Sequence, residues 1–376
     1  MTLPYGRQSI DEDDVRAVTD ALRDEFLTTG PGVARFESDL REVTGAPAVA
    51  ALSSGTAALH AAYAAAGLGP GDVLLTTPIT FAATATAALH LGAEVRFADV
   101  RDDTLTIDPG QVAQRLDSRT RLVAAVDYAG QPADLEPLLD VAHERGALLV
   151  EDASHAIGAR YRERPVGAVA DLTTFSFHPV KTVTTAEGGA VSGSEALVDR
   201  VRAFRNHGMM RDPSMLEWPD EGEWHQEVQL LGLNYRMSDV LAALGRSQLR
   251  KLPRFVERRA QLVHRYREAL RDVAGIRLLH VAEDREAAWH LFAIRVLDGR
   301  RRRVFERLRA EGIGVQVHYL PVHLHPVFRQ RGFSRGDFPV AEQAYEELLS
   351  LPLFPDMTDG DQESVLDALT RALAAA

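Results

Sequence analysis

The chain contains no cysteine, and this absence excludes disulfide bonds, catalysis by a thiolate and cysteine-bound metal ions. It also lacks a surplus of basic side chains: 54 acidic residues outnumber 42 basic ones among 376 residues, and the formal net charge is −12. This balance argues against a nucleic-acid partner, which needs a basic surface. It does not exclude an anionic ligand, because a pocket can be locally positive inside an acidic protein.

Long leucine-rich runs are missing as well. The most apolar stretch, residues 48–67, is rich in alanine and is interrupted by Ser53, Ser54 and His60, so we expect a buried helix here and no membrane span. The first residues carry acidic side chains and no apolar segment, so no signal peptide is expected and the chain is predicted to be cytoplasmic.

Helical and short apolar segments alternate along the first two thirds of the chain. Apolar runs without polar alternation are typical of strands covered on both faces, and their alternation with helices indicates an α/β fold with a mostly parallel central sheet. The predicted strands are residues 73–76, 94–98, 122–126, 147–150 and 171–177, and the predicted helices are residues 11–24, 54–67, 82–91 and 138–145.

The last third has a different pattern. A long helical segment, residues 238–273, is interrupted at Pro253, and proline kinks or ends a helix. We therefore predict a large domain of residues 1–253 and a small C-terminal α+β domain of residues 254–376. In the small domain we expect strands at residues 289–297 and 314–319, and helices at 302–311, 340–349 and 361–373.

The most informative side chain is Lys181, in the segment Phe-His-Pro-Val-Lys-Thr-Val-Thr-Thr-Ala-Glu-Gly-Gly. It follows an apolar strand, and its neighbours include Phe175, Phe177 and Val180. Such surroundings remove water from the amine and lower its pKa, which suits a lysine that bonds covalently to pyridoxal phosphate (PLP). Ser176 is a candidate donor to the phosphate. The alternative is a surface lysine in a loop.

A second candidate group follows the apolar run 147–150. Asp152 stands at the carboxyl end of this predicted strand, where ligands bind in α/β folds. PLP needs a carboxylate beside its pyridine nitrogen, which keeps the ring protonated. His155 would then face the ring or its phenolic oxygen. Alternatively, Asp152 only caps the following helix.

The third candidate group begins an alanine-rich helix. Gly55, Thr56 and Ala57 offer free backbone N–H groups and the positive end of the helix to a phosphate, although a plain helix cap is the alternative. Phe81 can stack on the pyridine ring or serve as a core aromatic. His318, His323 and His325 cluster in the sequence without a known metal spacing, so no metal is predicted.

These motifs, in this order, resemble the DegT/DnrJ/StrS family of sugar aminotransferases over nearly the whole chain. The lysine segment and Val-His-Tyr-Leu-Pro-Val-His are similar to the branch that aminates C4 of a sugar in pseudaminic acid biosynthesis, and Ala-Trp-His-Leu-Phe is also similar to the aminoarabinose branch. Further matching segments are residues 27–31, 126–130, 204–208, 232–239, 314–323 and 350–355.

The resemblance implies a fold-type I PLP-dependent transferase that works as a homodimer with shared active sites. Asn234 and Arg236 would reach the neighbouring subunit's phosphate or substrate pocket, although the aminoarabinose branch carries asparagine at the Arg236 position. The implied nucleotide-sugar contacts are Tyr5, Thr28, Thr29, His318 and Tyr319.

The implied reaction moves an amino group from glutamate to the 4-keto carbon of a nucleotide-linked 6-deoxyhexose. One alternative is C3 or C4 amination of a dTDP-keto sugar for an antibiotic. A PLP-dependent sugar 3-dehydratase is another, but those enzymes carry histidine where this chain has Lys181. Two further alternatives are a PLP-binding regulator without catalysis and a plain nucleotide-sugar binding module. No DNA-binding motif in the sequence supports the regulator.

Overall fold

The computed structural model describes residues 3–375, and its centre is a seven-stranded sheet in the order β1-β9-β8-β5-β4-β2-β3. The five strands from β8 to β3 are parallel, and β9 runs antiparallel to both β8 and β1. The predicted mostly parallel sheet is therefore confirmed. The strands are β1 (Ala48–Leu52), β2 (Val73–Thr76), β3 (Glu94–Phe97), β4 (Thr120–Val126), β5 (Leu148–Asp152), β8 (Leu172–Ser176) and β9 (Gly189–Gly193).

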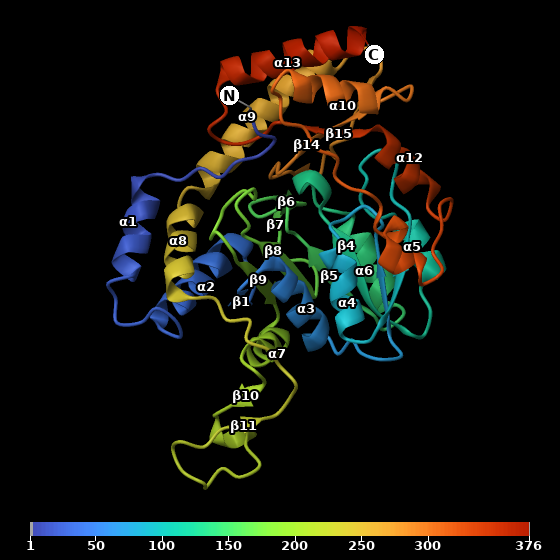
Figure 1. The fold of residues 1–376 in the computed structure, drawn as a ribbon. Helices are drawn as coiled ribbons and strands as arrows, with labels where there is room; N and C mark the ends of the chain where they lie inside the picture. Colours follow the sequence, from blue (N-terminus) through green and yellow to red (C-terminus); the bar gives the residue numbers. More distant parts are fainter. Residues whose placement is uncertain (1–2, 376) are drawn as a thin grey trace.

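Helices cover this sheet on both faces (Figure 1). Strands β1, β2, β5, β8 and β9 are buried along nearly their whole length, so none of them shows the polar–apolar alternation of a half-exposed strand; the polar side chains in β5 and β8 are buried as well. The helices around the sheet are α1 (Glu12–Ala21), α2 (Pro31–Thr44), α3 (Gly55–Ala65), α4 (Ala83–His90), α5 (Pro109–Arg115), α6 (Leu135–His143), α7 (Glu195–Arg205) and α8 (Asp239–Leu249).

A second apolar core lies beside the large sheet. Its antiparallel sheet has the order β12-β14-β15 and packs against three helices that Figure 1 shows above it. Whether the domain boundary falls at residue 253 stays a prediction. The elements of this core are α9 (Leu252–Leu270), β12 (Ile276–Leu278), β14 (Phe292–Val296), α10 (Arg301–Ala310), β15 (Leu348–Leu351) and α13 (Asp359–Ala374). Helix α12 (Pro339–Glu347) instead packs on the core of the large sheet through Ala341 and Ala344.

Three predicted elements were wrong in part. Residues 48–52 are strand β1, because their small side chains pair with the equally small residues of β9, and this pairing overrides the helix propensity of alanine. The helix begins only at Gly55, where the Ser54 side chain caps it. Residues 314–319 form no strand and make a single bridge at Gln316. The helix expected to reach residue 349 ends at Glu347, because β15 then pairs with β14.

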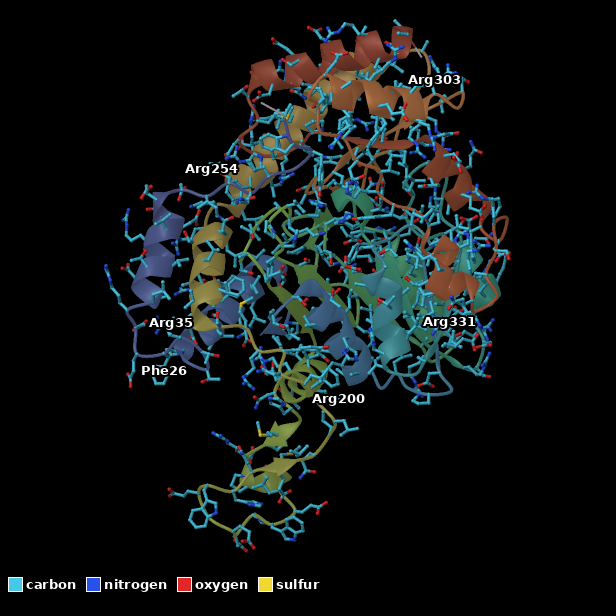
Figure 2. The ribbon with its side chains drawn as sticks, viewed as in Figure 1. Phe26, Arg35, Arg200, Arg254, Arg303 and Arg331 are labelled. Atoms are coloured by element: carbon cyan, nitrogen blue, oxygen red, sulfur yellow. The ribbon has the colours of Figure 1, made fainter. Side chains whose placement is uncertain are left out.

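A narrow projection leaves the main body after α7. It contains the two short strands β10 (Met209–Met210) and β11 (Glu227–Val228), and it extends downward in Figure 1. Figure 2 shows its side chains standing apart from the rest of the molecule, below the labelled Arg200 of α7. Trp224 is 83% exposed and Leu231 is 94% exposed, so this arm presents apolar side chains to solvent.

Candidate active site

A cavity of about 460 Å³ opens where the carboxyl ends of β4 and β5 meet the beginning of α3. Ligands of α/β proteins bind at this edge of the sheet. The structure brings together there most of the residues that the sequence singled out, although they are far apart in the chain. The predicted residues that line the cavity are Tyr5, Gly55, Thr56, Phe81, Asp152, His155, Ser176, Lys181, His318 and Tyr319.

Lys181 lies in the turn between β8 and β9, and its backbone N–H donates to the carbonyl of His178 at 2.9 Å. Burial lowers the pKa of its amine to about 8, and the negative charge of Asp152 opposes the shift only in part. The amine makes no hydrogen bond within residues 3–375. It lines the cavity, so a plain surface lysine is excluded, and near neutral pH a fraction of it is an uncharged nucleophile.

Asp152 is the last residue of β5 and is only 4% exposed. Its Oδ2 accepts a hydrogen bond from Oγ1 of Thr84 at 2.7 Å, and its Oδ1 accepts one from Oγ of Ser154 at 2.6 Å. The backbone N–H of Ser154 also donates to Oδ1, at 3.2 Å. The carboxylate thus closes a local turn, as its alternative role suggested, but no helix follows it. Its hydrogen bonds fix its orientation in the cavity.

Two histidines and a tyrosine form a polar wall next to Lys181. Nε2 of His155 lies 3.1 Å from the hydroxyl of Tyr319, and Nδ1 of His318 lies 2.9 Å from the hydroxyl of Ser350. Burial, followed by the charge of Lys181, lowers the pKa of His155 well below its usual value and that of His318 to about 4. Both rings are therefore uncharged at neutral pH.

At the beginning of α3, two of the three predicted phosphate-binding residues line the cavity. The backbone N–H of Ala57 is already bonded to Oγ of Ser54 at 3.0 Å, and Ala57 does not line the cavity. Gly55 and Thr56 do line it. A Cβ on Gly55 would stand 2.8 Å from Cβ of Ser176, so glycine is needed for the close approach of this turn.

Phe81 stands at the mouth of the cavity. Its side chain is 63% exposed, so it is not a core aromatic, and its ring meets the ring of Tyr319 edge to face at 6.4 Å. Tyr5 lines the same cavity, with its ring 5.3 Å from that of His318. The exposed face of Phe81 remains free for a planar ligand.

Four predicted residues lie elsewhere in the single chain. Thr29 and Arg236 line a second cavity of about 380 Å³, in which Nη1 of Arg236 donates to Oδ1 of Asn206 at 2.8 Å. Thr28 and Asn234 are exposed and line neither of the two cavities. Nε of Arg236 is buried without a hydrogen-bond partner in the described chain.

Sequence reasoning missed His290, which lines the cavity although it lies 109 positions beyond Lys181. Backbone bonds fix its segment to the end of β4: the N–H of Ala288 donates to the carbonyl of Gly130, and that of His290 to the carbonyl of Ala129, both at 3.0 Å. A Cβ on Gly130 would stand 2.3 Å from the carbonyl oxygen of Ala288. His178, Glu187 and Thr84 were also missed, although the first two stand in the lysine motif itself.

Comparison with known proteins identifies the chain's relatives. The model of the DegT/DnrJ/EryC1/StrS aminotransferase family matches residues 8–370. The chain belongs to this family. Spore coat polysaccharide biosynthesis protein SpsC of Bacillus subtilis is 37% identical over 374 residues, covering 98% of this chain and 96% of SpsC. A Campylobacter jejuni UDP-4-amino-4,6-dideoxy-N-acetyl-beta-L-altrosamine transaminase is also 37% identical, over 376 residues, with the same coverage.

Solved structures of aminotransferases have the same fold. The PLP form of the putative sugar aminotransferase Spr1654 from Streptococcus pneumoniae superposes with a TM-score of 0.93 at 27% identity, covering 100% of this chain and 99% of Spr1654. Helicobacter pylori PseC, an aminotransferase involved in the biosynthesis of pseudoaminic acid, also gives 0.93, at 28% identity, with both chains covered completely. The expected fold type I is confirmed, and the chain is a PLP-dependent sugar aminotransferase.

The DegT/DnrJ/EryC1/StrS cofactor fits the residues present. The cavity contains a partly buried amine without a hydrogen-bond partner in the described chain, a fixed carboxylate and a helix beginning whose glycine allows close approach. No helix among residues 3–375 is long and apolar enough to cross a membrane. Within the same range, no group of three or more histidines and carboxylates is arranged to hold a metal ion.

Proposed function

We propose that this aminotransferase moves an amino group from glutamate to the 4-keto carbon of a UDP-2-acetamido-2,6-dideoxy-4-hexulose or a close analogue. The observation that carries the sugar assignment is the transaminase from Campylobacter jejuni, which is 37% identical to almost the whole chain and whose name specifies a UDP-linked 4-amino-4,6-dideoxy sugar. Val180 next to Lys181 and the polar wall of His155, His318 and Tyr319 line the cavity and suit a sugar ring bound beside an amine. Phe175 and Phe177, which the sequence predicted beside this amine, are buried in the core and do not line the cavity.

The proposed roles follow from the geometry. When bound, PLP supplies an electron sink for the carbanion formed at the reacting carbon. Lys181 would hold the cofactor covalently and then act as the base that removes the proton from the α-carbon of the donor. In the second half-reaction the same amine returns a proton to C4 of the sugar. In the PLP-free protein burial already lowers the pKa of this amine to about 8, toward the range in which one group can both accept and give a proton near neutral pH.

The remaining residues would hold the cofactor. Asp152 would face the pyridine nitrogen, because its two oxygens are oriented by Thr84 and Ser154 while the side chain lines the cavity. His155 would contact the ring or its phenolic oxygen. Gly55 and Thr56 at the helix beginning, together with Ser176, would bind the phosphate.

We further propose a homodimer with shared active sites, acting in the cytoplasm. Arg236 has a buried Nε without a partner and lies in a cavity that is separate from Lys181 of its own chain. The arm presents Trp218, Trp224 and Leu231 to solvent, and apolar side chains of this size are typical of an interface. In the dimer, Asn234 and Arg236 would face the phosphate or nucleotide sugar of the partner, and Thr28 and Thr29 would join them.

The second candidate is amination at C3 or C4 of a dTDP-keto sugar. The 3-dehydratase alternative is disfavoured because Lys181 occupies the position where those enzymes carry histidine. A nucleotide-sugar binding module without catalysis is disfavoured, because binding alone does not require an amine that is desolvated at a cost in stability.

The decisive experiment incubates the purified protein with PLP, glutamate and a panel of UDP- and dTDP-linked 3-keto and 4-keto sugars, with mass spectrometry of the products. We expect the UDP-linked 4-keto sugar to give a product whose mass shows that the keto oxygen has been replaced by an amino group and a hydrogen. Exclusive amination of a dTDP sugar or of a 3-keto sugar contradicts the proposed substrate. The Lys181→Ala variant, as the control, should give no product.

A further inference from the structure

The cavity that one chain builds around Lys181 has little positive charge for a donor carboxylate, since Arg236 of the partner subunit is proposed above to bind the phosphate or the nucleotide sugar. Among its described lining residues, Lys181 is the only lysine or arginine, whereas Asp152 and Glu187 are both acidic. PLP adds a phosphate, and an amino acid donor adds at least one carboxylate. A carboxylate that enters such a site needs a cation or a proton beside it, because an unpaired buried charge is costly.

The histidines of the cavity wall are the groups that can supply this proton. Nε2 of His155 is engaged by Tyr319, and Nδ1 of His318 is engaged by Ser350. His290 is 5% exposed, and neither of its ring nitrogens has a hydrogen-bond partner within residues 3–375. Its Nδ1 is fully buried. Nδ1 of His155 also has no partner, but among these three buried histidines only His290 has both ring nitrogens unpartnered in the described chain.

The position of His290 is fixed on both sides. Its ring packs on the ring of His155 with 4.4 Å between centroids. Its carbonyl oxygen accepts a hydrogen bond from Nη1 of Arg259 at 3.3 Å, and Arg259 is a fully buried side chain of α9. A ring held in this way, and left unpaired, is preorganised for a ligand.

We infer that His290 binds the carboxylate of the amino donor and takes up the proton that neutralises it. This inference rests on the proposed function in one respect, namely that the donor is an amino acid such as glutamate. The unliganded ring is uncharged, because burial and then the charges of His155, Lys181, Arg259 and His318 hold the pKa of His290 well below its usual value.

A bound anion next to the ring would favour the charged form of His290. The carboxylate attracts a proton to the ring, and the resulting pair is a charge-assisted hydrogen bond. The other titratable groups that face this region are Lys181, His178 and Glu187 from the segment between β8 and β9, Asp152 from the end of β5, His155 from the turn after it, His318 and Tyr319 from the segment after α10, Tyr5 from the N-terminal segment, and Arg259 from α9.

The test measures binding of glutarate, an unreactive dicarboxylate, to the PLP-loaded enzyme by calorimetry. We expect His290→Phe to weaken glutarate binding roughly 10- to 100-fold, the usual effect of losing a hydrogen bond to a charged group. His290→Gln, which restores an uncharged donor, should recover part of the loss. Binding of UDP should be unchanged in both variants.

His323→Phe is the matched control. His323 is also a buried histidine with an unpartnered Nδ1, but it pairs with Glu342 outside the cavity. Its loss should leave glutarate affinity unchanged even if the melting temperature falls. NMR of histidine-labelled enzyme provides the second readout. The signal of His290 is the one that is present in the wild-type enzyme and missing from His290→Phe. In the wild-type enzyme at pH 7.5 it should report an uncharged ring without glutarate and a charged ring with glutarate.

Three results would overturn the inference: wild-type affinity in His290→Phe, a ring that stays uncharged with glutarate, or no glutarate binding by the wild-type enzyme. Loss of affinity in Arg236→Gln but not in His290→Phe would instead assign the carboxylate to the partner's arginine. None of these binding measurements involves a sugar. A wrong sugar assignment would therefore show only in the product analysis with the UDP- and dTDP-linked keto sugars, and would leave these results unchanged.

Discussion

Arg236 donates a hydrogen bond to Asn206 at 2.8 Å, and this contact holds its guanidinium in a different cavity from the one that Lys181 lines. A single chain therefore does not unite the two cationic residues that the proposed reaction uses. They can act on one substrate only if two chains combine their sites.

Mixing two inactive variants tests this arrangement. Lys181→Ala and Arg236→Gln should each be inactive or nearly so, whereas a mixture refolded together should regain about a quarter of wild-type turnover, because half of the dimers are mixed and each has one intact site. Turnover of the mixture is measured against each variant alone. A mixture as inactive as its components would contradict sharing of the site.

The buried amine of Lys181 should destabilise the PLP-free protein. Replacement by methionine should raise the free energy of unfolding at pH 7 by about 2 kcal/mol, because the charged amine is desolvated and its pKa is lowered to about 8. The folded protein releases this proton near pH 8, and the unfolded chain holds it until about 10.5. Wild-type stability therefore rises relative to the variant across this range, and the difference vanishes above it.

Urea unfolding of both PLP-free proteins at pH 7 and pH 10 measures the effect. A less stable Lys181→Met protein at pH 7 would show that the amine is solvated or paired. Lys251→Met provides a contrast, since Lys251 pairs with Asp14 at 2.8 Å and its loss should destabilise the fold.

Gly55→Ala should weaken PLP binding roughly 10-fold or more, because its methyl group would stand 2.8 Å from Cβ of Ser176 and displace a phosphate-binding side chain. Titration of PLP, followed by its absorbance, measures the dissociation constant. Gly69→Ala is the matched control, since no atom lies within 4 Å of the added methyl and PLP affinity should stay at the wild-type value.

Asp152→Asn should reduce turnover about 10²- to 10³-fold while PLP remains bound, because the amide keeps the shape of the side chain but removes the charge. The rate with glutamate alone and the bound PLP content are measured together. Asp127→Asn changes another buried acidic side chain, which does not line the cavity; burial and then Glu151 raise the pKa of Asp127 well above its usual value, so little charge is lost and the rate should change less than twofold. An equal loss in both variants would point to folding.

Local signals in the sequence located the sheet and the centre of the site. Strand β2 was predicted with its observed bounds, and Lys181 and Asp152 were placed together because both follow buried strands. His290 escaped because residue 290 fell inside a predicted strand, whereas β14 begins only at Phe292. Its place in the cavity depends on backbone bonds to Ala129, and no local pattern encodes a contact between segments 161 residues apart.

The bonds that join Ala288 and His290 to the turn at Ala129 and Gly130 have a consequence for motion. They tie β14 and its core to the floor of the cavity, and the missing Cβ of Gly130 lets the two backbones touch. A hinge at this point would have to break them. Movement of β14 and its core away from the cavity would therefore cost these hydrogen bonds, whereas the exposed ring of Phe81 lies at the mouth of the cavity, where a ligand can enter without breaking them.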